Sequence, residues 1–164
     1  MPNHISNKIE FSCNEELAQK ILSEISGENG AVDFNSLIPT PVHIYQGDLK
    51  GDDKNDFQEH NCWTNWNLAN WGTKWNAHEF DIKNQDGAVS IYFETAWGAP
   101  FPFIIAFAQK YKLSFTHKYF DEAGNFWGVD TWENGIRIIR NRDNQEIYHQ
   151  LSIELMGYDR EEEQ

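Results

Sequence analysis

Two alternating apolar segments joined by a glycine turn constrain the fold of this chain more than any other feature of its sequence. HEFDI (residues 78–82) and AVSIYFETAW (88–97) flank the turn sequence NQDG (84–87). An Asp-Gly pair between alternating segments is a strong β-hairpin signal, because both residues tolerate the positive φ angles of tight hairpin turns. One face of the second segment is apolar and carries Val89, Ile91 and Phe93. The chain is therefore expected to build an antiparallel sheet with one buried face.

A strand and a capped helix are expected before this hairpin. In NKIEFSC (residues 7–13) every second residue is apolar from Ile9 onward, which is typical of a strand with one buried face. Asn14 is then a suitable helix N-cap. Apolar residues repeat at four-residue spacing over 17–25, and Gly27 is a suitable stop. The first part of the chain is therefore read as a β–α unit.

Further elements follow the hairpin. FIIAFAQKY (103–111) comes after two prolines and has apolar residues at helical spacing, which predicts a helix. KLSFTHKYF and NFWGVDTW flank DEAG (121–124) and predict a second hairpin, and GIRIIR (135–140) predicts one more strand.

The last helix is expected to begin at Asp143 or Asn144 and to end near Gly157. Elements in this order predict an α+β domain with a ferredoxin-like core: an antiparallel sheet with helices packed on one face, plus an inserted loop and an extra hairpin. A chain of 164 residues fits one domain. We expect this domain to span residues 1–158, with an acidic loop insertion at 43–61, and to be followed by an acidic tail at 159–164.

The charge of the chain excludes one class of function and favours another. A net charge of −13, from 26 acidic and 13 basic residues, disfavours direct nucleic-acid binding, which needs several Lys or Arg side chains facing phosphates. The only dense basic set is Arg137, Arg140 and Arg142. An acidic surface can instead occupy the basic surface of a nucleic-acid-binding partner.

No segment predicts export or membrane contact. The N-terminal sequence MPNHISNKIEF lacks a basic start followed by a long apolar run. No stretch approaches the roughly 18 apolar residues of a membrane span. The two cysteines, Cys13 and Cys62, make no disulfide framework. A cytoplasmic protein without membrane contact is expected.

Motifs for metal binding and catalysis are missing from the sequence. His60 and Cys62 form one short pair, but no second pair completes a metal-ligand set, so neither a metal nor a cofactor is expected. A nucleophile elbow and a phosphate-binding loop are absent. Acid–base catalysis stays open because several carboxylates fall near strand ends, although no spacing rule selects a pair. These are Glu94, Asp121, Glu122, Asp130 and Glu133. We expect a protein that is not an enzyme and has no catalytic residues.

The segment NCWTNWNLANWGTKWNA (61–77) carries four tryptophans. Large aromatic residues mostly supply buried area, and asparagine side chains can tie an irregular segment to itself, so the favoured interpretation is structural. The alternative is an aromatic pocket for a small molecule or a nucleotide. Its residues would be Trp66, Trp71, Lys74, Trp75 and Trp97.

Three segments together are similar to a known family. DFNSLIPTP (33–41), NWGTKWNA (70–77) and YFETAWGAPFPF (92–103) occur in this order, and their combination resembles the YubB-like family of proteins carried by phages and plasmids. The resemblance covers most of the chain, from the first strand to the last hairpin. It implies a ferredoxin-like domain, and it carries over no catalytic residue and no cofactor.

The resemblance also implies an accessory protein of a mobile genetic element, located in the cytoplasm of a bacterial host cell. Together with the net charge, it favours a non-enzymatic, anti-CRISPR-like inhibitor that binds the basic surface of a host protein or ribonucleoprotein as a nucleic-acid mimic. The charge would be presented by Asp48, Asp52, Asp53, Asp56 and Glu59, with Glu161 to Glu163 of the tail. Two alternatives stay open: a small-molecule or nucleotide-binding module or weak enzyme that uses the Trp-lined pocket, and an assembly protein of the element.

Overall fold

The computed structural model describes residues 2–47 and 62–158, and every structural statement below concerns these residues. The acidic tail at 159–164 and most of the loop insertion at 43–61 lie outside them. The elements are β1 (His4–Ser12), α1 (Glu15–Ile25), the 3-10 turn η1 (Phe34–Ser36), α3 (Trp63–Asn70), β2 (His78–Gln85), β3 (Ala88–Ala96), α4 (Phe101–Tyr111), β4 (Phe115–Asp121), β5 (Trp127–Glu133), β6 (Ile136–Arg142) and α5 (Gln145–Met156).

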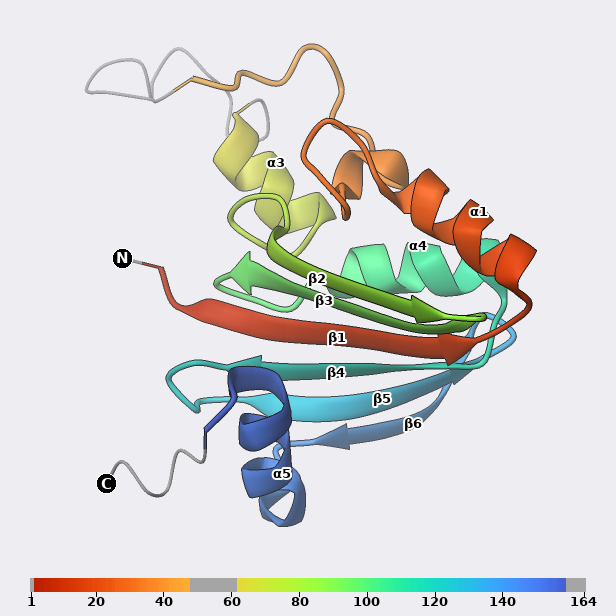
Figure 1. Cartoon of the computed structure of the whole chain (residues 1–164). Coiled ribbons are helices and arrows are strands. Elements are labelled where there is room, and N and C mark those ends of the chain that lie inside the picture. Colours follow the sequence, from red (N-terminus) through yellow and green to blue (C-terminus); the bar gives the residue numbers. More distant parts are fainter. Residues whose placement is uncertain (1, 48–61, 159–164) are drawn as a thin grey trace.

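The strands form one six-stranded sheet in the order β2-β3-β1-β4-β5-β6. Every neighbouring pair is antiparallel. Strand β3 lies between β1 and β2 (Figure 1). The two strands that α1 connects are therefore not neighbours in the sheet, because β3, which follows β2 in the chain, is inserted between them. The first four strands with α1 and α4 are the ferredoxin-like arrangement, and the β5–β6 hairpin extends the sheet beyond β4. The expected α+β, ferredoxin-like fold class is confirmed.

Helices cover both faces of the sheet rather than one. The main core lies between one face and α1 with α4, and it buries Ile9, Ile21 and Phe107 among others. On the opposite face α5 packs against β1, β4 and β5 (Figure 1). A second apolar cluster there joins Leu151 and Leu155 of α5 to Phe120 and Trp127 of the sheet. The expectation that the helices share one face was therefore wrong for α5, because β4 and β5 carry apolar side chains on both of their faces.

Asparagine side chains start two of the helices as the sequence predicts. Asn14 accepts a hydrogen bond from the Leu17 backbone N–H at 2.8 Å, and Asn144 accepts one from Glu146 N–H at 3.0 Å. Helix α5 ends at Met156, and Gly157, which caps it, has a φ angle of 84°. The two asparagine caps satisfy backbone donors that have no partner inside the helix, so they fix where α1 and α5 begin.

The segment after α1 enters the main core through one aromatic ring. Phe34, the first residue of η1, is fully buried, and its ring lies 4.8 Å from that of Phe103 and 5.6 Å from that of Trp71. Asn76 holds this segment in place: its Oδ1 accepts the Phe34 N–H, and its Nδ2 donates to Asp33 Oδ1. The Trp-rich block and residues 33–36 therefore form one packed unit above the sheet.

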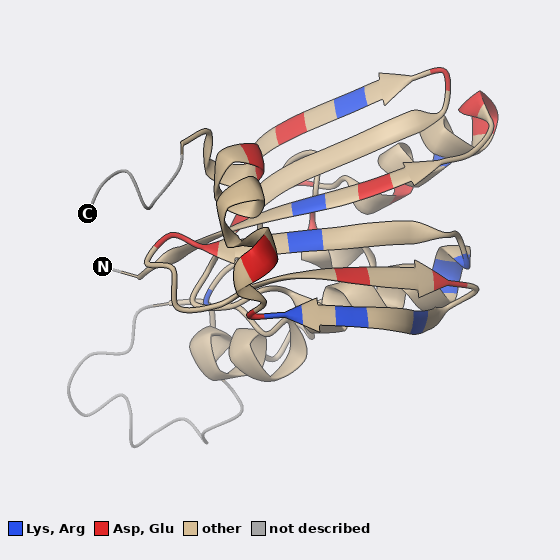
Figure 2. Ribbon diagram, turned by 90° about the horizontal axis from the view of Figure 1, so that it is seen from below, with Lys and Arg blue, Asp and Glu red and all other residues tan. Residues whose placement is uncertain are grey.

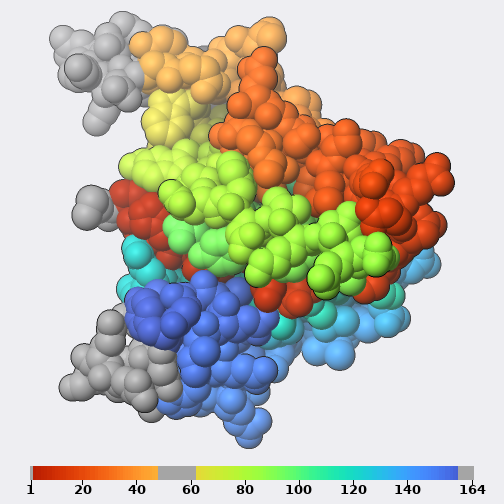
Figure 3. Space-filling view, viewed as in Figure 1, coloured from red at the N-terminus to blue at the C-terminus, as the bar shows by residue number. Residues whose placement is uncertain are grey.

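Strand β2 forms an open edge of the sheet. Among the described residues it pairs with β3 alone, and β6 forms the other edge. In the space-filling view the lime-coloured residues of β2 form part of the surface between α1 and α5 (Figure 3). Side chains that β2 contributes to the α5 face are therefore within reach of solvent.

Candidate functional site

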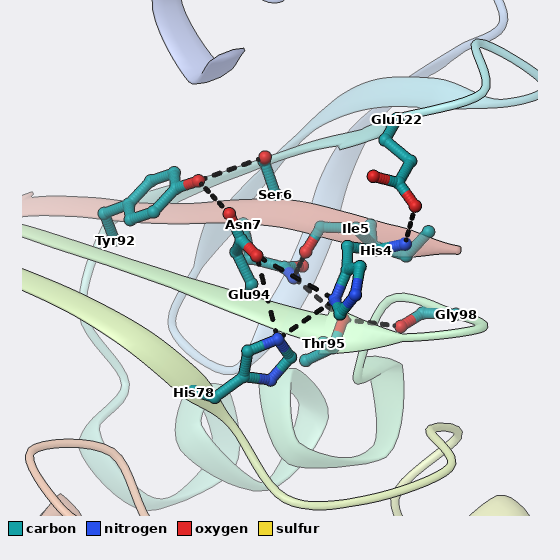
Figure 4. A network of polar contacts seen from close by, with 10 residues as sticks. All are labelled: His4, Ile5, Ser6, Asn7, His78, Tyr92, Glu94, Thr95, Gly98 and Glu122. Carbon is teal, nitrogen blue, oxygen red and sulfur yellow. Dashed lines mark hydrogen bonds and ion pairs between the residues drawn. The ribbon is translucent and has the colours of Figure 1, made fainter. Parts of the chain in front are cut away.

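Three potential metal ligands meet at one end of the sheet, on the face that carries α5. His4 begins β1, His78 begins β2, and Glu94 lies near the end of β3 (Figure 4). One ligand atom from each side chain lies within 4.8 Å of the other two. Within residues 2–47 and 62–158, no other group of three His, Cys, Asp or Glu side chains is gathered this closely.

Strand register brings these residues together. Glu94 is paired across the sheet with Ser6 of β1 and with His78 of β2. His4 lies two residues before Ser6, so it shares the face of Glu94. A register shift between His78 and Asp81 marks a bulge, and Glu79 within it has a φ angle of 53°. Bulges re-aim side chains at the edges of sheets, and this one lies directly beside His78.

The two carboxylate oxygens of Glu94 contact different groups. Oε2 faces the imidazoles, at 3.9 Å from His4 Nδ1 and 3.7 Å from His78 Nε2. Oε1 accepts a hydrogen bond from the Tyr92 hydroxyl at 3.0 Å. The two imidazoles approach each other at 3.1 Å between His4 Nδ1 and His78 Nε2. One oxygen is therefore oriented by the protein, while the other points at the nitrogens.

Tyr92 remains a hydrogen-bond donor at physiological pH. Burial raises the pKa of Tyr92 to about 12, and the nearby Glu94 carboxylate raises it as well, against a lowering by the Ser6 hydrogen bond. The Ser6 hydroxyl lies 3.1 Å from the Tyr92 oxygen. Because the Tyr92 hydrogen is directed to Glu94, Ser6 donates to Tyr92. This chain of donors fixes the orientation of the carboxylate.

A pocket of about 240 Å³ opens over this group. Its wall is formed by the side of the sheet and by the end of α5, and it is lined by His4, Ser6, Tyr92, Glu94, Glu122, Leu155, Met156 and Tyr158. Glu122 accepts a hydrogen bond from the backbone N–H of His4 at 2.7 Å. Two of the three ligand residues, His4 and Glu94, thus line a concave, half-buried surface that a small ligand or water can enter.

The carboxylates singled out from the sequence are dispersed. Glu94 and Glu122 both line this pocket. Asp121 is fully buried and accepts hydrogen bonds from Asn3 and Asn125, which is a structural role. Asp130 is also fully buried and pairs with arginines of β6. Glu133 ends β5 and is exposed.

The tryptophans fall into two groups. Trp71 is buried in the main core, donates its indole N–H to the Ile38 carbonyl, and packs edge-on against Trp66 at 5.3 Å. Lys74 lies between the rings of Trp75 and Trp97, at 4.9 and 4.8 Å from their centres. Helix α3 ends at Asn70, so Trp71 and Trp75 lie beyond it. Of the five residues of the proposed aromatic pocket, Trp71 and Trp75 line one cavity formed by described residues.

A cavity of about 320 Å³ does lie beside the Trp-rich block. Its lining includes Trp63, Trp71 and Trp75 together with four polar amide side chains. Trp66, Lys74 and Trp97 are not part of it. The acidic residues expected to bind a partner, Asp48, Asp52, Asp53, Asp56 and Glu59, lie outside the described residues.

A family model described as a ferredoxin-like domain in Api92-like protein matches residues 70–164, more than half of the chain. The chain belongs to the Api92-like family. The matched residues include His78, Tyr92 and Glu94 but not His4, which lies on β1, between β3 and β4 in the sheet.

A solved structure supports the same fold. The crystal structure of protein Api92 from Yersinia pseudotuberculosis is similar with a TM-score of 0.54 and 13% sequence identity. The match covers 68% of this chain and 39% of the Api92 chain, so this chain spans about two fifths of that protein. No curated protein sequence matches the chain. No helix among the described residues is long and apolar enough to cross a membrane.

Proposed function

We propose that this member of the Api92-like family binds a divalent transition-metal ion through His4, His78 and Glu94. The observation that carries the proposal is the convergence of two imidazole nitrogens and one carboxylate oxygen, from three adjacent strands, within 4.8 Å. The half-buried surroundings support it, since His4 and Glu94 line a pocket of about 240 Å³.

The spacing of the three atoms suits a metal ion. Ligands that lie about 2.0–2.2 Å from a tetrahedral zinc ion are separated from each other by about 3.4 Å. The three separations here are 3.1, 3.7 and 3.9 Å. Small side-chain rotations would therefore bring all three atoms onto one ion, without movement of the strands.

The donor types select the class of ion. Imidazole suits zinc, copper, nickel and iron, whereas calcium and magnesium prefer sets made only of oxygen ligands. Tyr92 supplies the outer-shell hydrogen bond that orients a metal-binding carboxylate. Three protein ligands leave at least one coordination position for water or a small ligand, and the pocket lined by Ser6 and Glu122 provides room for it.

Zinc titration of the purified chain by calorimetry tests this proposal. We expect one Zn²⁺ per chain, with binding lost as the pH falls because only neutral imidazole coordinates metal. His78→Ala should abolish measurable binding, and Tyr92→Phe should weaken it by about 10- to 100-fold, the usual effect of an outer-shell change. At a free zinc concentration of 100 times Kd, the free energy of unfolding should rise by about 2.7 kcal/mol.

A matched control comes from a histidine elsewhere in the chain. His43 is exposed and is not part of the three-residue group, so His43→Ala should bind zinc as the natural sequence does. Absence of zinc binding, or an equal loss in the His43 and His78 variants, would contradict the proposal.

A second candidate function rests on charge. A net charge of −13 supports the proposal that the chain is an acidic interaction protein of a mobile element, which inhibits a host nucleic-acid-binding or defence complex by occupying its basic surface. The similarity of its motifs to the YubB-like family points the same way.

Capture from host lysate by the tagged chain tests the second candidate. We expect a nucleic-acid-binding complex at low salt that is released at high salt. A variant with amide side chains at five acidic positions should capture much less of that complex. The five positions are Asp48, Asp52, Asp53, Asp56 and Glu59. Equal capture by both forms, or capture that salt does not weaken, would overturn this role of the loop.

A further inference from the structure

The dense basic set of the sequence lies on the edge strand β6, where blue segments mark Lys and Arg (Figure 2). Strand register places Arg137, Arg140 and Arg142 opposite Trp132, Asp130 and Gly128 of β5. All three arginines therefore belong to the face of the sheet that carries α4, away from α5 and from the His4–His78–Glu94 group.

Two of these arginines line a cavity of about 390 Å³ at the start of α4. Its walls are largely aromatic and apolar: Ala99, Phe101, Pro102, Tyr119 and Phe126, with Gly72 and Gly98. Its charged lining consists of Arg140, Arg142 and Asp143. Arg137 is not part of it. A volume in this range is typical of small-molecule sites, which combine apolar walls with a few placed polar groups.

Arg142 is held in a fixed position. Its guanidinium lies 4.4 Å from the centre of the Phe101 ring and donates to Asp130 Oδ2 at 3.1 Å. Its Nε is buried and has no hydrogen-bond partner among the described residues. Among the described residues Arg140 forms no ion pair, and it is exposed. One arginine is therefore preorganised, and the other is available to a ligand.

Tyr119 adds a second group without a partner. The residue lines the cavity wall and is only 2% exposed, and its hydroxyl, which lies against Gly128, makes no hydrogen bond among the described residues. Burial raises the pKa of Tyr119, so the hydroxyl stays protonated and can donate. A buried donor left unpaired costs free energy.

We propose that this cavity binds a small aromatic anion, a flat ring joined to a phosphate or carboxylate, with the ring against Phe101 and Phe126 and the anionic group at Arg140 and Arg142. The start of α4 supports the same polarity, because helix N-termini favour negative charge. Asp143, whose Oδ1 accepts a hydrogen bond from the Trp127 N–H, is the one acidic residue in the lining, against two arginines. Aromatic stacking and arginine together are the chemistry by which proteins hold nucleotides and aromatic acids.

Binding of four probes tests the proposal: adenosine 5′-monophosphate, benzoate, adenosine and inorganic phosphate. We expect one or both of the ring-bearing anions to bind, and adenosine and phosphate, which lack one half of the ligand, to bind at least about tenfold more weakly. Binding of the nucleotide alone or of benzoate alone identifies the phosphate or the carboxylate as the anionic group. NMR should show a shift of the Arg142 Nε–H signal on binding.

Arg140→Gln and Arg137→Gln form the matched pair, since both remove one charge from β6 but only Arg140 lines the cavity. Arg140→Gln should weaken the ring-bearing anion by about tenfold or more, and Arg137→Gln should leave its affinity within about twofold. Equal weakening by both variants would overturn the site in favour of general attraction. Failure of both ring-bearing anions to bind at millimolar concentration, or phosphate binding as tightly as they do, would overturn it as well.

Discussion

Arg142→Met is expected to lower the free energy of unfolding by about 3 kcal/mol, because it leaves a buried carboxylate without its closest partner. Asp130 is fully buried, and its Oδ2 lies 3.1 Å from Arg142 Nη2 and 3.7 Å from Arg137 Nη1. The loss should fall at the lower end of the usual range because Arg137 remains. Urea denaturation followed by circular dichroism measures it.

A double variant separates the effect of charge from the effect of packing on stability. Adding Asp130→Asn to Arg142→Met removes the stranded charge and should recover most of the lost stability, since replacing both members of a buried pair often costs little. In the natural sequence His117, opposite Asp130 on β4, carries no compensating charge, because burial and the nearby Arg142 lower the pKa of His117 to about 3. A double variant as unstable as Arg142→Met alone would show that packing against Phe101, and not charge, explains the loss.

Phe34→Ala is expected to cost about 3–5 kcal/mol, the range for removing a large ring from a well-packed core. Phe34 is fully buried and contacts the rings of Trp71, Phe93 and Phe103. The cavity would lie where α4, the Trp-rich block and the sheet meet, so all three would lose contacts. The same denaturation experiment measures this loss.

Val42→Ala provides the control for this segment. Val42 follows the same proline-bearing stretch but is fully exposed, so its truncation should change stability by less than about 0.5 kcal/mol. A Phe34→Ala variant that loses less than about 1 kcal/mol would contradict the view that residues 33–36 are part of the main core.

Local sequence signals predicted the six strands and the helices α1, α4 and α5, whereas α3 and η1 were not predicted. The NQDG turn, the Asn14 and Asn144 caps and the stop at Gly157 all lie where the structure has them. Each of these depends on a few adjacent residues, so the information is present in a short window. The side of the sheet on which α5 packs was missed, because it depends on which faces of β4 and β5 remain apolar once the sheet is assembled.

The candidate metal site was not predictable in the same way. His4 and His78 are 74 residues apart in the sequence. His78 and Glu94 lie at opposite ends of the β2–β3 hairpin in the sequence, and each ligand comes from a different strand. No spacing rule joins them, because the contact arises from the pairing order β2-β3-β1. The cavity beside β6 shows the same limit. The arginine cluster is visible in the sequence, but the contacts of Arg142 with Phe101 and Tyr119 arise only when the strands pair in the folded chain.

The open edge formed by β2 gives the metal proposal a consequence for amide hydrogen exchange. Edge strands open locally at a lower free energy than central ones. His78 is the first residue of β2, and its two proposed co-ligands lie on β3 and β1, so a bound ion would tie the start of this edge to the middle of the sheet. Amide protons of residues 78–82 should then exchange more slowly when metal is present. The opposite edge, β6, holds none of these ligands, and its amides should exchange at the same rate with and without the ion.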